Sequence, residues 1–167
     1  RHMSVKEFGV GFGEMQKAIG IIILGLLITS TSSSNELIPL KKYLDDHPIS
    51  NTAASEAPTV IYMTIRCSGL YAFYAVIMKE KNPEAAAKLT YVSTLFVHAA
   101  AKIDSQFSDR SFSESLKNMI VAAEKIMKSY KKDGEDNWTK TGSFIQGSYI
   151  EDDDEICKDA KKNVMNQ

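Results

Sequence analysis

The chain has 167 residues, of which 44% are hydrophobic, 25% charged and 9% aromatic, and its 20 basic and 21 acidic residues leave a net charge of -1. This is the composition of one ordinary globular domain, and it excludes collagen-like and largely disordered chains. The near-zero charge also argues against a protein held on nucleic acid by an overall positive field. We therefore expect a compact domain and no nucleic-acid partner.

The N-terminal part has the pattern of a signal peptide. An apolar, uncharged run covers residues 18–28, with Lys17 before it and small side chains over 29–34. A membrane-spanning helix needs about 20 apolar residues, whereas the core of a signal peptide needs roughly 7–15, followed by small residues. Residues 15–34 therefore predict export to the periplasm or secretion. The alternative interpretation of the run is a membrane-anchoring or buried segment.

The domain organisation follows from this interpretation. The first three residues, Arg1-His2-Met3, are typical of those that an expression vector leaves. We expect residues 1–34 to combine these vector residues with the signal-peptide-like segment, and residues 35–167 to form a single helical domain. Membrane contact is expected through the N-terminal segment alone.

The predicted domain begins with a short helix over 36–44, where apolar residues recur at helical spacing. A polar loop follows over 45–58, within which residues 53–57 could add one helical turn. Residues 59–78 then carry a single charge, that of Arg66. Such a segment fits either a transmembrane helix or the buried central helix of a soluble bundle. An arginine inside a transmembrane helix costs about 2.5–3.5 kcal/mol, so we expect a central apolar helix over about 59–80.

Two patterns predict helix N-termini in the middle of the chain. In Asn82-Pro83-Glu84 the asparagine can cap a helix, the proline has no hydrogen bond to lose in the first turn, and the glutamate favours the positive end of the helix dipole. We expect this helix over 83–104 and a loop over 105–110. Ser111 and Glu114 then match a capping box, which predicts the start of the next helix.

The last third of the chain predicts one helix end, one loop and one further helix. Lysines gather before Gly134, a pattern typical of a helix C-terminus, and residues 135–150 mix aromatic side chains with glycines, as in an ordered loop. The last helix is expected to begin at the acidic run 151–155 and to end among lysines. The predicted fold class is therefore all-α, a compact bundle of four to five helices around the central apolar helix.

The two cysteines, Cys67 and Cys157, predict a disulfide that staples the central helix to the last one, because an even number of cysteines in an exported chain favours pairing. Two buried thiols in a reduced protein are the alternative. A third hypothesis makes Cys67 a nucleophile with His98 as its base, but a lone histidine on an inner helix is more often a hydrogen-bonded core residue.

No phosphate-binding, dinucleotide-binding, serine-hydrolase or zinc-protease motif occurs in the chain, and the acidic run lacks the spacing of a calcium loop. We therefore expect no catalytic residues, no metal and no cofactor. Arg66 needs an acid or carbonyl groups if it is buried, which makes it a candidate for an ion pair or for ligand binding, together with Tyr62 and His98. An acidic surface for a basic partner is expected at Asp152, Asp153, Asp154 and Glu155.

These observations favour a small exported binding or interaction protein over an enzyme. An inhibitor, an immunity protein or an accessory subunit would have these properties, and its partner would be another protein or a small ligand. The alternative function is that of a membrane-associated helical protein in which residues 18–28 and 59–78 both contact lipid.

Overall fold

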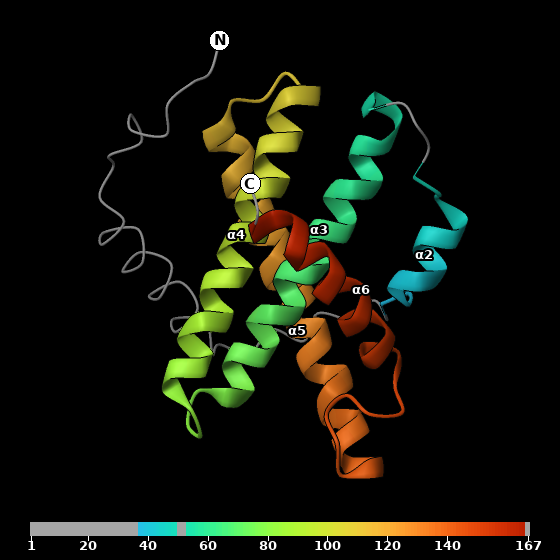
Figure 1. Cartoon of the computed structure of the whole chain (residues 1–167), viewed down its shortest axis with the longest axis vertical. Helices are drawn as coiled ribbons and strands as arrows, with labels where there is room; N and C mark the ends of the chain where they lie inside the picture. Colours follow the sequence, from blue (N-terminus) through green and yellow to red (C-terminus); the bar gives the residue numbers. More distant parts are fainter. Residues whose placement is uncertain (1–36, 50–52, 166–167) are drawn as a thin grey trace. The chain divides into compact units, whose positions relative to one another are not determined.

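The computed structural model describes residues 37–49 and 53–165, and Figure 1 shows the helices within these ranges. The expected all-α fold class is confirmed, and the described residues contain no strand. The signal-like segment and the boundary at residue 34 lie outside the described residues. The helices are α2 (Leu40–Asp46), α3 (Ala53–Met78), α4 (Pro83–Phe107), α5 (Phe112–Thr141) and α6 (Tyr149–Met165).

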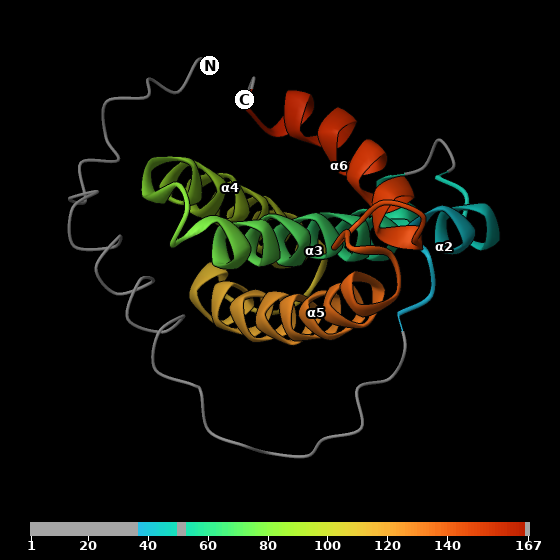
Figure 2. The ribbon, with the colours of Figure 1, turned by 90° about the horizontal axis from the view of Figure 1, so that it is seen from below.

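The apolar helix α3 is central, as the sequence predicts. Figure 2 shows it in the middle of the described helices, with α5 on one side and α4 and α6 on the other. Because the connections after α3 and α4 are short, α4 runs antiparallel to both α3 and α5, which run in the same direction. Their facing side chains form the core, whose most buried members are Leu70, Phe73, Phe96, Ala100 and Tyr130.

Close approach of α3 to its neighbours depends on small residues. A Cβ atom placed on Gly69 would lie 2.5 Å from Cγ2 of Ile126 and 3.0 Å from the backbone nitrogen of Met127, so no larger residue fits at this crossing with α5. On the side of α4, the hydroxyl of Ser68 lies 3.0 Å from both the carbonyl oxygen and the hydroxyl of Ser93. The small residues of α3 thus allow two helices to pack tightly against it.

The predicted helix starts after α3 are confirmed in detail. The side chain of Asn82 accepts a hydrogen bond from the backbone N–H of Ala85 at 3.0 Å. At the start of α5, the Ser111 hydroxyl accepts from the N–H of Glu114, and the Glu114 carboxylate accepts from the N–H of Ser111. Both caps use residues three positions apart, which is why the sequence alone identifies them.

Several predicted boundaries differ from the structure. The first helix, expected over 36–44, is observed as Leu40–Asp46, and the last begins at Tyr149, two residues before the acidic run. Helix α3 begins at Ala53, where one helical turn was the alternative to a loop over 45–58, and it continues without a break through Pro58. The proline removes one helical hydrogen bond, but Ala57 and Thr59 are buried, and this burial compensates for the loss. Helix α4 continues past residue 104 to Phe107.

The largest difference concerns α5, which does not end at Gly134. The helix continues to Thr141 and ends at Gly142, whose φ of 75° is the left-handed conformation typical of a C-terminal glycine. Gly134 lies inside the helix because the ring of Phe73 packs against it, where a Cβ atom would come within 2.7 Å of the ring. Its role is therefore close packing, not helix termination.

Candidate functional site

The charge of Arg66, in the middle of the apolar helix α3, is completely buried, with 0% of the residue exposed. Its Nε donates a hydrogen bond to the hydroxyl of Tyr130 at 2.9 Å, and its Nη1 donates to the carbonyl of Ile38 at 2.7 Å and to the hydroxyl of Tyr62 at 3.1 Å. Its Nη2 forms an ion pair with Asp153 of α6. Of the two roles that the sequence leaves open for this arginine, the structure shows the ion pair.

Asp153 completes the network. One of its carboxylate oxygens accepts the N–H of Leu40 at 2.7 Å, and the other accepts the hydroxyl of Tyr130 at 2.5 Å. Burial disfavours the charge of Arg66, but Tyr130 and Asp153 outweigh it and raise the pKa of the guanidinium above its ordinary value. Because its members come from α3, α5, α6 and the start of α2, the network joins four helices.

The disulfide lies directly beside this network. Cys67 follows Arg66 on α3, Cys157 lies one turn after Asp153 on α6, and their Cα atoms are 5.2 Å apart. The predicted staple is confirmed, and both of its residues are fully buried. A disulfide is consistent with an oxidising, exported compartment.

The hypothesis of a Cys67–His98 nucleophile pair is wrong for this oxidised chain, because a sulfur in a disulfide is not available as a thiolate. The ring of His98 instead contacts that of Phe112 at 6.0 Å between centroids. Burial lowers the pKa of His98 and so favours its neutral form. Among the described residues, no group of three or more histidine, cysteine or acidic side chains could hold a metal ion.

The predicted acidic surface on α6 requires a correction. Asp153 is 0% and Asp154 7% exposed, and Asp154 forms an ion pair with Lys158 at 2.5 Å, whereas Asp152 and Glu155 are exposed. Consecutive residues of a helix point in directions about 100° apart, so a run of acids cannot all face the solvent. Only two of the four expected carboxylates are therefore accessible to a partner.

A second polar cluster closes the connection between α4 and α5. Asp104 accepts two hydrogen bonds from the guanidinium of Arg110, at 2.9 Å from Nε and 2.5 Å from Nη2, and a third from the hydroxyl of Ser115 at 2.7 Å. The hydrogen bonds from Arg110 lower the pKa of Asp104. Asp104 lies in the last turn of α4, Arg110 in the connection and Ser115 in the first turn of α5, so the cluster holds the turn.

An aromatic series leads from the core to the surface at the C-terminal end of α5. Phe73 is fully buried, Phe144 lies with its ring centroid 6.2 Å away, and Trp138 stacks on Phe144 at 4.7 Å with 28° between the ring planes. Trp138 is nevertheless 49% exposed. We name Trp138 and Phe144 the aromatic surface.

The loop that carries Phe144 is held by side-chain hydrogen bonds. The amide of Asn137 donates to the carbonyls of Ser143 at 2.8 Å and of Gln146 at 3.0 Å. The backbone N–H of Gly147 donates to the carboxylate of Glu151 at 3.0 Å. The aromatic surface is therefore supported on both sides, by helix α5 and by a constrained loop.

Sequence analysis did not identify Trp138 as a candidate, because its segment was expected to be a loop with buried aromatic side chains. Two signals were present: it is the single tryptophan of the chain, and its neighbours Asn137 and Thr139 are polar. An exposed large aromatic residue is informative, since such residues are usually buried.

Comparison with protein-family models, with curated proteins and with solved structures finds no match to this chain. Helix α3 is long and apolar enough, over Ser55–Met78, to cross a membrane by length and composition, and 56% of its most apolar stretch is buried in the fold. The central helix of a soluble bundle has the same properties.

Proposed function

We propose that this chain is a small exported helical protein that acts by binding a partner through the aromatic surface. The observation that carries the proposal is Trp138, a large aromatic side chain that is half exposed yet held in place by stacking on Phe144. Tryptophan is enriched among the residues that dominate binding energies. A ring already held in one orientation also loses little conformational entropy when a partner binds.

The other chemically capable side chains support binding over catalysis. Cys67 is in a disulfide, Arg66 and Asp153 neutralise each other inside the fold, and Asp104 accepts three hydrogen bonds. These contacts stabilise the fold and leave the groups little freedom to react. Within the aromatic surface, Phe144 packs against the core, whereas Trp138 is not among the side chains packed against it.

Export is supported by two independent features. The disulfide fits an oxidising compartment, and the signal-like pattern over residues 15–34 provides a route to the periplasm or the exterior. We do not propose the membrane-associated alternative, because lipid contact along residues 59–78 would require α3 to leave the bundle and would expose the ion pair of Arg66 to hydrocarbon.

Two measurements on the protein in its natural host test the proposal. Non-reducing mass spectrometry of the exported fraction should find a mature N-terminus near residues 30–34 and an intact disulfide. Affinity capture from the same fraction should retain a partner on the wild-type protein and lose it with Trp138→Ala. The matched control is Tyr91→Ala, which removes another exposed aromatic side chain, on α4.

A reduced protein confined to the cytoplasm would contradict export. Identical capture by the wild type and by Trp138→Ala would contradict the aromatic surface as the binding site. The helicity of both variants should first be compared by circular dichroism. If Trp138→Ala loses helicity, the milder Trp138→Phe replaces it. We expect Trp138→Phe to weaken capture without unfolding the protein.

A further inference from the structure

We infer that the partner bound by the aromatic surface is a cationic protein segment, rich in arginine or lysine. The inference rests on the proposed function and adds the chemistry of the partner. Its starting point is the charge of the surroundings: between residues 133 and 155 the chain has eight acidic residues and one basic residue, Lys140. The acidic residues are Asp133, Glu135, Asp136, Glu151, Asp152, Asp153, Asp154 and Glu155.

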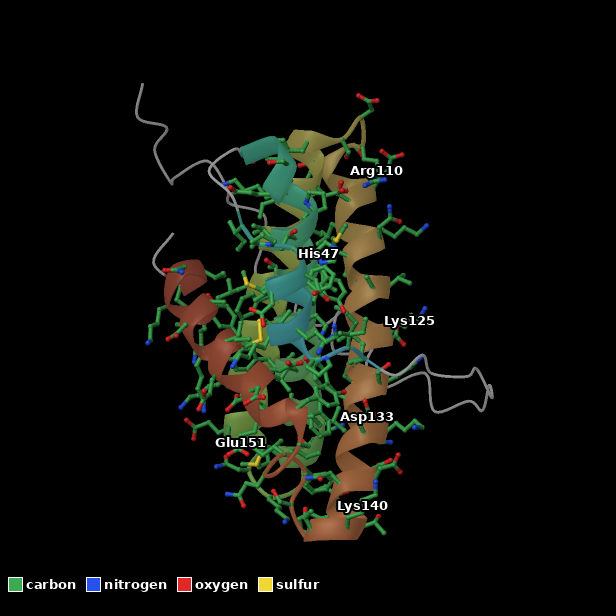
Figure 3. The ribbon with its side chains drawn as sticks, turned by 90° about the vertical axis from the view of Figure 1, so that its right-hand side faces the viewer. His47, Arg110, Lys125, Asp133, Lys140 and Glu151 are labelled. Carbon is green, nitrogen blue, oxygen red and sulfur yellow. A yellow bond between two sulfur atoms is a disulfide. The ribbon has the colours of Figure 1, made fainter. Side chains whose placement is uncertain are left out.

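The fold brings the two acidic groups of this stretch together. The hydroxyl of Tyr149, at the start of α6, donates a hydrogen bond to Asp133 on α5 at 2.5 Å. Figure 3 shows Asp133 and Glu151 at neighbouring levels of α5 and α6, above Lys140 at the end of α5. The acidic start of α6 therefore lies beside Asp133 of α5, and Trp138 follows Glu135 by three residues on the same helix, so that these two exposed side chains are neighbours on its surface.

Several of these carboxylates remain accessible. Asp153 and Asp154 are buried in ion pairs, but Asp152 and Glu155 are exposed. Glu135 and Asp136 pair with lysines at 3.7 and 3.4 Å on the surface, where such pairs contribute at most about 1 kcal/mol and can exchange partners.

An exposed tryptophan beside carboxylates favours binding of an arginine or lysine side chain. The face of its ring attracts a cation, and a guanidinium group can stack on it. The apolar stem of arginine or lysine can cover the ring while its charged head reaches the carboxylates. A neutral apolar partner would use the ring but not the acids, and an anionic partner would be repelled.

The middle of α5 carries positive charge, in contrast to the acidic end of the helix. This difference bears on which surface a cationic partner would bind. The outward side of this middle part carries three lysines, of which one pairs with Glu124 at 3.1 Å, and Val121 between them is 61% exposed. A cationic segment is repelled there more than at the acidic end of the helix. The three lysines are Lys117, Lys125 and Lys128.

The test uses the oxidised full chain and a short fluorescein-labelled peptide of alternating arginine and glycine, with a glutamate–glycine peptide as its counterpart. We expect the arginine peptide to bind, as measured by anisotropy, and to change the fluorescence of Trp138, the single tryptophan. Trp138→Ala should weaken binding about tenfold. Raising the salt concentration should also weaken it.

A matched pair of variants separates a local site from general attraction to acids. Glu135→Gln combined with Asp136→Asn removes two exposed charges on α5 within one turn of Trp138. Glu80→Gln combined with Asp109→Asn removes two exposed charges from the turns after α3 and α4. We expect the first double variant to weaken binding of the arginine peptide about tenfold and the second to leave it unchanged within about twofold.

The inference is overturned if the glutamate peptide binds as well as the arginine peptide, if Trp138→Ala binds like the wild type, or if the two double variants weaken binding equally. Its failure can be told apart from failure of the proposed function. Loss of peptide binding with continued Trp138-dependent capture of a natural partner would remove the cationic chemistry alone, whereas absence of both would remove the binding site itself.

Discussion

Two regions of this molecule reverse the usual distribution of side chains. At the junction of α3 and α6 a full charge pair, Arg66 with Asp153, is buried beside a disulfide. At the end of α5 the largest apolar side chain, Trp138, is half exposed. Buried charges and exposed aromatic rings are both informative departures, but they have different consequences. The first region holds helices together, and the second presents an aromatic ring to the solvent.

Helices α5 and α6 are attached to the rest of the fold in different ways. Helix α5 packs on α3 through apolar contacts and the close approach at Gly69. Helix α6 also buries Ile150 and Ala160 in the core, but it is joined in addition by an ion pair, hydrogen bonds and a covalent bond. A buried ion pair adds little net stability but demands one geometry, so we interpret the junction as the feature that sets the position of α6.

The largest effect is expected from Asp153→Ala. The substitution leaves the charge of Arg66 buried without its partner and removes the acceptor of the Leu40 N–H, so the free energy of unfolding should fall by about 3–5 kcal/mol in urea titrations. Replacing both charges, as Arg66→Met with Asp153→Leu, should cost less than Asp153→Ala alone. Additive losses in the double variant would contradict an energetic coupling of the pair.

Removal of the disulfide should rank second. Cys67→Ser with Cys157→Ser is expected to lower the free energy of unfolding by about 2–5 kcal/mol. Hydrogen exchange should then accelerate in α6 more than in α4, because α6 loses its covalent attachment. Equal acceleration in every helix would show that the bond stabilises the fold as a whole. Reduction of the wild type is the control and should reproduce the variant.

Gly69→Ala tests the apolar attachment of α5. The added methyl group would clash with the side chain of Ile126 and the backbone of Met127, which should destabilise the protein by about 1–3 kcal/mol in thermal or urea unfolding. Asn118→Ala, at an exposed position of α5, is the control and should leave stability unchanged or slightly higher. A stabilised Gly69→Ala would mean that the helices can separate without cost.

The smallest effect on stability is expected from lowering the pH. In the folded chain the hydrogen bonds from Arg110 hold the pKa of Asp104 below its ordinary value of 3.8. Its carboxylate therefore stabilises the fold above about pH 4, and this contribution is lost as the pH falls through 3.8 towards the folded value.

Asp104→Asn should cost about 1 kcal/mol at neutral pH, since Arg110 is half exposed and water screens the pair. The difference in unfolding temperature between wild type and variant should shrink below pH 4. A difference that stays constant with pH would assign the effect to packing.

Local patterns in the sequence were sufficient for much of the fold. The Asn82 cap and the Ser111–Glu114 capping box each lie within a few residues and correctly predict where a helix begins. The apolar run around Arg66 correctly predicts a central helix. The disulfide also follows from the number of cysteines. These features depend on short-range hydrogen bonds, on hydrophobic periodicity or on counting, which require no knowledge of the fold.

The tertiary structure alone decided the rest. By its sequence context Gly134 looks like a helix end, but in the fold Phe73 packs against it. Asp153 looks like a surface acid, but the fold places it beside Arg66, which is 87 residues away in the sequence. Trp138 resembles a buried loop residue until α5 extends past it. In each case the deciding contact comes from another helix, and the free energy of such a contact depends on packing that no short stretch of sequence contains.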